Sequence, residues 1–178
     1  AIMISSPPYS VPTSKENALS ALTIDKATNL PILLYNYPGR TSVNMDKEYL
    51  DIISESKNFF AIKESSGEID RIDFFKAGCK SWVCAGSNFA AIAHIKLWKT
   101  CVIDKDFEKG KRVWEAMKPL MTNLEQGGKF IQSIKYGVDL KDIVAGPPRS
   151  PLLPLDNNEQ NDLKNIINEI NNKINQID

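Results

Sequence analysis

Residues 59–67 read Phe-Phe-Ala-Ile-Lys-Glu-Ser-Ser-Gly, and this stretch does most to decide the fold of the 178-residue chain. A short apolar run, Phe59–Ile62, ends at Lys63 and is followed by small polar residues that stop a strand. Strands that are apolar throughout are typical of parallel sheets covered on both faces. We therefore predict that residues 58–63 form a parallel strand with Lys63 at its carboxyl end.

The same alternation of apolar runs and helical patterns continues on both sides of this strand. We predict further strands at residues 1–6, 31–35 and 82–85, and helices at residues 13–26, 46–56, 69–76 and 88–100. Thr13 and Glu16 have the spacing of a capping box. Strand–helix alternation indicates βαβ units of an α/β fold. From the residues alone, four such strands fit either a small open sheet or half of a barrel.

From residue 106 onward the pattern is helical. Apolar residues recur at helical spacing within residues 113–124 and again within residues 163–174. Residues 146–154 (GPPRSPLLP) must be extended, because four prolines exclude a helix. We therefore divide the chain into an α/β part, residues 1–104, and a helical region, residues 105–178.

Composition excludes several classes of function. Basic and acidic residues number 22 each, so a formal net charge of zero argues against nucleic acid or an anionic membrane as a partner. No apolar run is long enough to span a bilayer. Three cysteines without a CxxC pair, and one histidine, give no metal-ligand spacing and indicate buried reduced thiols of a cytoplasmic protein. The chain opens in an apolar run without Met, so we expect that an upstream stretch is missing.

Lys63 has a position that suits covalent chemistry. In parallel α/β folds the carboxyl ends of the strands face the active site. Apolar walls around a lysine at that position disfavour its charged form, and the neutral amine can then attack a carbonyl. The alternative is a strand-end lysine with its head in water, which is the commoner case for a single lysine.

Other residues could share this site. Tyr35 ends a predicted strand, so its hydroxyl would face the same end of the sheet and could pass protons to and from a carbinolamine. Arg40 follows a Pro-Gly turn, where a guanidinium suits a carboxylate. The alternatives are an aromatic plug in the sheet and an exposed loop arginine. Gly86 and Ser87 lie between a predicted strand and a helix, where small residues and free N–H groups favour a ligand.

Two spaced motifs give these residues a common explanation. Residues 35–41 (YNYPGRT) resemble the Tyr-Asn-x-Pro-x-Arg-Thr motif of the dihydrodipicolinate synthase / N-acetylneuraminate lyase family of class I pyruvate aldolases. Residues 61–67 (AIKESSG) resemble its Schiff-base motif, Ile-Lys-Glu-x-x-Gly, at the family's separation. Residues 6–9 and 146–152 resemble its Pro-Tyr segment and its C-terminal linker. Matching pieces occur in order along the whole chain.

The resemblance implies a TIM (β/α)8 barrel, present here from strand four on, followed by extra C-terminal helices. It implies that pyruvate forms an imine with Lys63 and that Tyr35 relays protons. Arg40 would place the carboxylate of the second substrate, and Val83 would contact pyruvate through its backbone. No metal or organic cofactor is implied. The partners would be pyruvate and an aldehyde, and the chain would form a homotetramer or a dimer.

Within the family, Arg40 favours a dihydrodipicolinate-synthase-like member, which condenses pyruvate with aspartate semialdehyde on the lysine pathway. The alternative is an aldolase or dehydratase of 2-keto-3-deoxy sugar acids.

The sequence also departs from the family. The first three strands are absent, and one strand–helix unit is missing near residues 72–74. We interpret both gaps as residues absent from this sequence rather than from the protein; a true truncation, which would be inactive, is the alternative. Ser10 stands where the synthases carry a second relay tyrosine, and it leaves open a non-catalytic barrel paralogue.

Overall fold

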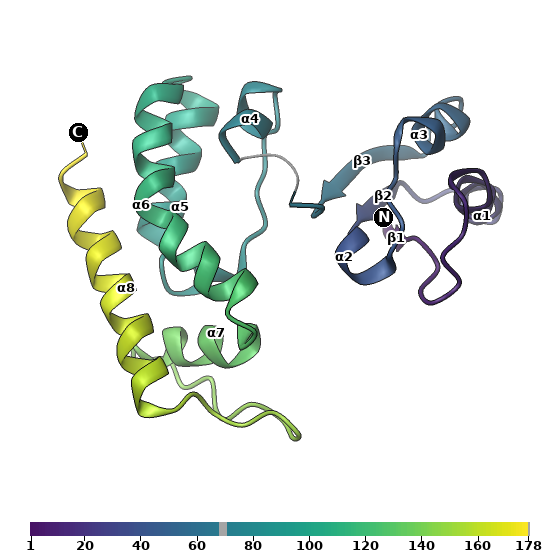
Figure 1. Cartoon of the computed structure of the whole chain (residues 1–178). Helices are drawn as coiled ribbons and strands as arrows, with labels where there is room; N and C mark the ends of the chain where they lie inside the picture. The colour runs from purple at the N-terminus through teal and green to yellow at the C-terminus, as the bar shows by residue number, and fades with distance from the viewer. Residues whose placement is uncertain (68–70, 178) are drawn as a thin grey trace. The chain divides into compact units, whose positions relative to one another are not determined.

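The computed structural model describes residues 1–67 and 71–177 (Figure 1). The chain divides into two compact units, Ala1–Ile69 and Asp70–Asp178, and each is described by itself. The first unit holds a parallel sheet with its crossover helices, and the described part of the second is helical. The expected division between residues 104 and 105 concerns the barrel of a whole family member, and it stays a prediction.

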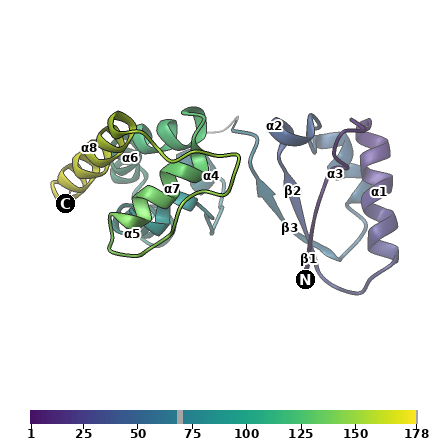
Figure 2. The same cartoon turned by 90° about the horizontal axis from the view of Figure 1, so that it is seen from below.

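The first unit is a three-stranded parallel sheet. Its strands, in the spatial order β1-β2-β3, are β1 (Ile2–Ser5), β2 (Ile32–Asn36) and β3 (Phe59–Glu64). The crossovers contain α1 (Ser14–Lys26), α2 (Pro38–Thr41) and α3 (Lys47–Ile53). In Figure 2, α1 and α3 lie side by side next to the strands. The three strands predicted in this part of the sequence, and their parallel arrangement, are confirmed.

A small apolar core joins the sheet to its helices. Ile32 and Leu34 of β2 are buried against Ala18 of α1 and Tyr49 of α3. Because side chains alternate along a strand, Leu33 and Tyr35 face the other side of the sheet. The core therefore fixes which side of β2 is turned away from the helices.

Caps fix where the helices of this unit begin. The Thr13 hydroxyl accepts a hydrogen bond from the Glu16 N–H, and the Glu16 carboxylate accepts one from the Thr13 N–H at 2.8 Å. This confirms the predicted capping box. Asp46 caps α3 by accepting from the Tyr49 N–H at 2.9 Å. Such caps satisfy N–H groups that the first helical turn leaves unpaired.

The second unit packs around one long helix. In Figure 1, α6 (Phe107–Gln126) has α5 and α8 beside it. Its other described helices are α4 (Arg71–Lys76), the 3₁₀ helix η1 (Ala85–Asn88), α5 (Ala91–Trp98), the π-helix η2 (Lys99–Ile103), α7 (Phe130–Asp139) and α8 (Asn157–Asn175). The predicted helical character after residue 106, and the absence of helix from residues 146–154, are confirmed.

Two predictions in this unit need correction or a limit. Residues 82–85 are no strand, because residues 82–84 lie outside regular structure and η1 begins at Ala85. Trp82 packs instead against the rings of His94, at 4.9 Å, and Trp114, at 5.9 Å. Within this apolar run Trp82 packs against helical residues while Val83 is exposed, and the described residues offer no neighbouring strand to pair with. Of the helix predicted at residues 69–76, residues 69 and 70 lie outside the described residues, and α4 covers the rest.

The three cysteines differ in exposure. Cys101 is buried, Cys84 is half-buried and Cys79 is exposed. A Cβ added to Gly110 of α6 would lie 2.4 Å from the Cys101 sulfur, so the helix closes directly over this thiol. Burial raises the pKa of the Cys84 and Cys101 thiols. The expectation that all three are buried was wrong for Cys79, which follows the turn at the end of α4.

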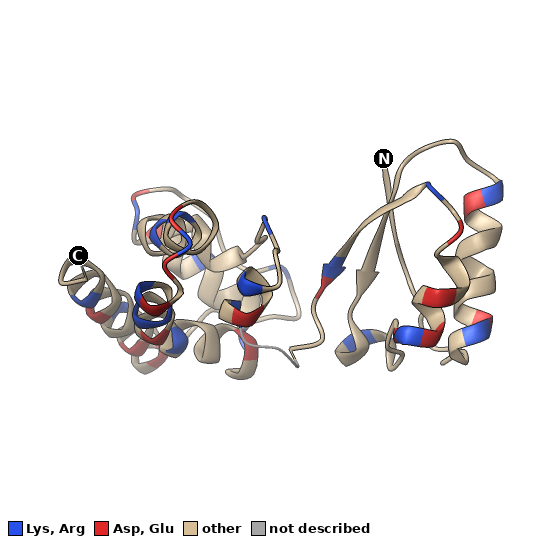
Figure 3. Cartoon of the chain, turned by 90° about the horizontal axis from the view of Figure 1, so that it is seen from above, with Lys and Arg blue, Asp and Glu red and all other residues tan. Residues whose placement is uncertain are grey.

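The surface charges are mixed in both units. Figure 3 shows Lys and Arg interspersed with Asp and Glu along the helices, with no extended field of one sign. This agrees with the formal net charge of zero. Among the described residues, no helix is both long and apolar enough to cross a membrane.

His94 is a buried ionisable residue of the second unit. Its side chain is 6% exposed, and its Nδ1 lies 2.8 Å from the Ala90 carbonyl oxygen. Its Nε2 has no hydrogen-bond partner among the described residues. Burial lowers the pKa of His94 below its ordinary value of 6.5. The folded unit therefore favours the neutral ring.

We predict that this unit loses stability as the pH falls through 6.5, the ordinary pKa of the ring. Below that value the unfolded chain binds a proton at His94 while the folded chain does not. The free energy of unfolding therefore declines until the pH is below the lower pKa of the folded state. Urea unfolding followed by tryptophan fluorescence measures this, because all three tryptophans lie in this unit.

The control is His94→Asn, whose amide can replace the donor to Ala90 but does not titrate. It should show a shallower decline between about pH 8 and pH 5.5. An equal pH dependence in the two proteins would contradict the assignment.

Candidate active site

Strands β2 and β3 place Tyr35 and Lys63 directly opposite each other. The two residues are register partners in a parallel pair, so their side chains lie on the same face of the sheet. Both side chains are half-buried. The Lys63 Nζ lies 4.1 Å from the centroid of the Tyr35 ring. The structure thus brings together the two residues expected to carry the chemistry, while their catalytic roles stay predictions.

The ring of Tyr35 is held from a second direction by Tyr37. Their centroids are 5.6 Å apart, with the planes inclined by 30°. An ammonium over a ring face is attracted by the negative face of the aromatic system. Among the described residues, the Tyr35 hydroxyl makes no hydrogen bond. The ring thus contacts both Lys63 and Tyr37, and a role of its hydroxyl in proton transfer stays a prediction.

The next pair along the strands was missed by the sequence reasoning. Asn36 and Glu64 are also register partners, and the Asn36 amide donates to the Glu64 carboxylate at 2.8 Å. Because side chains alternate, this pair lies on the side of the sheet opposite Tyr35 and Lys63. Both residues stand inside the two recognised motifs, each directly after a predicted site residue. That adjacency was the available signal.

Arg40 projects from a short, well-braced turn. It lies in α2 and is exposed, and its N–H donates to the Tyr37 carbonyl oxygen at 2.9 Å. The Thr41 hydroxyl contacts the carbonyl oxygens of Tyr37 and Val43, each at 3.1 Å. In the part of the chain that the structure describes, no ion pair involves Arg40. Its guanidinium is accessible to a carboxylate, and that role stays a prediction.

Ser10 sits in a local turn of the loop after β1. Its hydroxyl lies 3.5 Å from the Pro7 carbonyl oxygen, and its N–H donates to the Pro8 carbonyl oxygen at 2.9 Å. Its neighbour Tyr9 is fully exposed and has a positive φ of 70°. The turn holds the backbone where the resemblance places a second tyrosine, but Ser10 offers no aromatic hydroxyl there.

The remaining predicted contacts belong to the second unit. Val83 is 80% exposed and outside regular structure. Gly86 is buried, and a Cβ there would lie 3.2 Å from the Leu124 side chain, so its small size is explained by close packing. Ser87 uses both its N–H and its hydroxyl on the Cys84 carbonyl oxygen, at 3.2 and 2.6 Å. Their assignment as substrate contacts stays a prediction.

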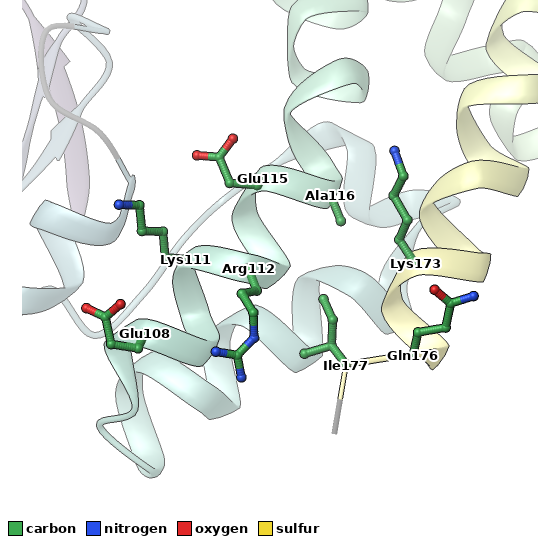
Figure 4. Close-up of a pocket in the computed structure, with 8 residues that line it drawn as sticks. All are labelled: Glu108, Lys111, Arg112, Glu115, Ala116, Lys173, Gln176 and Ile177. Carbon is green, nitrogen blue, oxygen red and sulfur yellow. The ribbon is translucent and has the colours of Figure 1, made fainter.

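A groove between α6 and α8 lacks the convergent side chains of an active site. It encloses about 650 Å³ and is lined by Glu108, Lys111, Arg112, Glu115, Ala116, Lys173, Gln176 and Ile177. Figure 4 shows its charged side chains pointing apart rather than toward one point. Over residues 1–67 and 71–177, no cluster of three or more His, Cys, Asp or Glu side chains could hold a metal ion.

The sequence matches a known family over most of its length. A sequence model of the Dihydrodipicolinate synthetase family matches residues 1–75 and 71–170. The 4-hydroxy-tetrahydrodipicolinate synthase 1 of Halalkalibacterium halodurans is 28% identical, over 94% of this chain and 63% of its own length. That of Clostridium acetobutylicum is 30% identical, over 92% of this chain and 62% of its own length.

Solved structures agree. The dihydrodipicolinate synthase of Thermotoga maritima has a TM-score of 0.80 at 26% identity, covering 95% of this chain and 65% of that one. A 2-keto-3-deoxygluconate aldolase of Sulfolobus sulfataricus has a TM-score of 0.79 at 19% identity, covering 98% and 66%. At that identity the second match shows the fold alone.

The first unit defines a class, the parallel α/β chains. The matching solved structures are (β/α)8 barrels, and that this chain is part of such a barrel stays a prediction. Within that class, the chain belongs to the Dihydrodipicolinate synthetase family, as the two motifs predicted. It spans just under two thirds of the length of the curated relatives that it matches.

The matches also bear on the gap expected near residues 72–74. The alignment with the Thermotoga neapolitana synthase has 197 positions, more than the 178 residues of this chain. That relative therefore has residues inside the matched span that lack a counterpart here. The two family-model segments meet at residues 71–75. Both findings are in keeping with a missing strand–helix unit, which stays a prediction.

We predict that Tyr35 stabilises the first unit through its ring rather than its hydroxyl. Tyr35→Phe should keep the free energy of unfolding within about 0.5 kcal/mol, whereas Tyr35→Leu should lower it by about 1–2 kcal/mol, because the contacts with Lys63 and Tyr37 are lost. Urea unfolding followed by circular dichroism measures both. Tyr9→Leu, at a fully exposed tyrosine, is the control and should change little. Equal losses in the two Tyr35 variants would contradict the prediction.

Proposed function

We propose that this protein is an imine-forming lyase that condenses pyruvate with an aldehyde, with Lys63 as the nucleophile. The observation that carries the proposal is the Lys63 Nζ held 4.1 Å from the centre of the Tyr35 ring at the carboxyl ends of β2 and β3. Carboxyl ends of parallel strands are where (β/α)8-barrel enzymes place their chemistry. Membership of the Dihydrodipicolinate synthetase family supports the same reaction class.

The chemistry follows from an amine beside a phenol. The neutral Lys63 amine attacks the keto carbon of pyruvate and gives a carbinolamine, which loses water to form the imine. Loss of a proton from the pyruvate methyl group gives an enamine, whose carbon attacks the aldehyde. Each step moves a proton at an oxygen or carbon near the nitrogen, and the Tyr35 hydroxyl supplies a group that can accept and return it. The mechanism proposed here calls on no metal or organic cofactor.

For the second substrate we propose aspartate semialdehyde. The two curated relatives compared above are named 4-hydroxy-tetrahydrodipicolinate synthases. Arg40, accessible on its braced turn, supports a substrate that carries a carboxylate. The partners would be small molecules, and the protein would act in the cytoplasm as a homotetramer or dimer. One solved relative is described as a monomeric dihydrodipicolinate synthase variant, so assembly differs among the relatives.

We predict that borohydride traps pyruvate on Lys63. Incubation with pyruvate and borohydride should add one reduced pyruvate to the peptide that contains Lys63, because borohydride reduces an imine to a stable amine. Mass analysis of the digest measures this. Lys63→Met should abolish the adduct, whereas Lys57→Met, at a lysine of the same unit outside the site, should leave it unchanged. A protein without the adduct would contradict the proposed imine chemistry and would fit a non-catalytic paralogue or a truncated, inactive chain.

A substrate panel tests the choice of aldehyde. With pyruvate present, we expect turnover with aspartate semialdehyde and at least tenfold slower turnover, as an order of magnitude, with glyceraldehyde or in the cleavage of 2-keto-3-deoxy sugar acids, because only the first substrate offers a carboxylate placed for Arg40. Steady-state pyruvate consumption measures the condensations, and pyruvate release, assayed without added pyruvate, measures the cleavage of sugar acids. Arg40→Leu should raise KM for aspartate semialdehyde and leave pyruvate trapping unchanged. Turnover of sugar acids alone would replace the synthase by the sugar-acid aldolase.

A further inference from the structure

The pairing of β2 with β3 contains an irregularity, so the strands could pair in more than one register. Ile32 pairs with Phe59 but Leu33 pairs with Ala61, so Phe60 is an extra residue in β3. A shift of one residue between paired strands turns every side chain to the opposite face. Sliding β3 by one position would remove Lys63 from its place opposite Tyr35.

Apolar burial does little to decide this register. Side chains of a half-buried strand normally alternate between buried and exposed, and that alternation specifies pairing. In β3, three consecutive residues, Phe60, Ala61 and Ile62, are exposed, with Phe60 at 58% and Ile62 at 41%. Within the described residues, β3 also pairs with β2 alone. Something other than hydrophobic patterning must hold the carboxyl end of β3 in place.

A polar clamp supplies that specificity one residue beyond the site. The Asn36 amide nitrogen donates to Glu64 at 2.8 Å and to Asn44 at 2.7 Å, and its oxygen accepts from the Met45 N–H at 3.0 Å. The other Glu64 oxygen accepts from the Ser66 N–H at 2.6 Å. Both oxygens of the carboxylate and both polar atoms of the amide are therefore engaged.

The clamp can form in one register only. Asn36 is 2% exposed, so a shifted β3 would leave one N–H of its buried amide without the carboxylate, while the other still donates to Asn44. An unpaired buried polar group costs about 1–3 kcal/mol. The backbone adds to the same choice, because the Ser65 N–H donates to the Asn36 carbonyl oxygen at 2.9 Å.

We propose that Asn36 and Glu64 are positioning residues of the active site. Their hydrogen bond, on the helix side of the sheet, selects the register that sets Lys63 against Tyr35 on the other side. The inference rests on the proposed imine chemistry of Lys63. Neither residue touches the reacting atoms in this arrangement.

The donor and acceptor pattern of the clamp can be reversed, which gives a sharp test. In Glu64→Gln, an NH₂ group would face a donor, either Asn36 or the Ser66 N–H. In Asn36→Asp, an oxygen would face the Glu64 carboxylate. When both substitutions are combined, the amide introduced at position 64 can donate to the carboxylate introduced at position 36, while the amide oxygen keeps the Ser66 N–H. The exposed Asn44 can turn its own amide to donate to that carboxylate. The control, Asn44→Asp, adds a charge but keeps an acceptor for Asn36.

Two measurements at low temperature report on the position and reactivity of Lys63. The first is the rate of borohydride trapping per folded molecule, as a function of pyruvate concentration. Each single variant should lower the maximal rate about tenfold or more, the double variant should recover most of it, and Asn44→Asp should stay close to the parent. The second is competitive acetylation of Lys63 relative to Lys47, whose side chain is 86% exposed. The labelling ratio should change at least twofold, roughly, in the single variants and return in the double variant.

The outcomes separate the clamp from the chemistry. If the parent traps no pyruvate, the proposed function fails, and acetylation alone still decides the clamp. If the parent traps pyruvate and the single variants match it in both measurements, the clamp is overturned while the imine chemistry stands. Single variants with a lower unfolding temperature but an unchanged rate per folded molecule show a purely structural role and also overturn it. A double variant no better than the single ones overturns it whatever their stability.

Discussion

The parallel pairing of β2 with β3 is the constraint on which the candidate site depends. One ladder fixes two faces at once: Tyr35 and Lys63 meet on one side, and Asn36 and Glu64 meet on the other. The crossover helices pack against Ile32 and Leu34, whose burial directs the opposite face of β2, with Tyr35, away from the helices. The pair of strands therefore converts a separation of 28 positions in sequence into direct contact.

The described second unit is stabilised differently, and its packing offers a structural reason for the residues that were predicted there as substrate contacts. Its core is continuous along α6, and a side chain at Gly86 would crowd Leu124 and Met121. Ser87 donates hydrogen bonds from both its N–H and its hydroxyl to the Cys84 carbonyl oxygen. Small or polar residues at the start of a helix can thus be explained by local packing, whereas Lys63 and Tyr35 contact each other across two strands.

Much of the first unit could be predicted from its sequence, because its signals are local. Apolar runs ending in turn residues mark the three strands, and Thr13 and Glu16 mark a helix start. Predictions failed where the outcome depends on distant partners. Trp82 is an aromatic residue of a type common in strands, yet its neighbours are the rings of His94 and Trp114. The clamp of Asn36 and Glu64 was likewise missed, because an amide and a carboxylate each have many possible partners until the register is known.

The closure of α6 over Cys101 has a consequence for oxidation chemistry. Gly110 lies against that sulfur, and burial keeps both Cys101 and Cys84 in the poorly reactive thiol form. Cys79 alone among the three is exposed. Among the cysteines, a thiol-specific reagent therefore meets one exposed sulfur, which makes Cys79 a natural single attachment point for a fluorescent or paramagnetic probe.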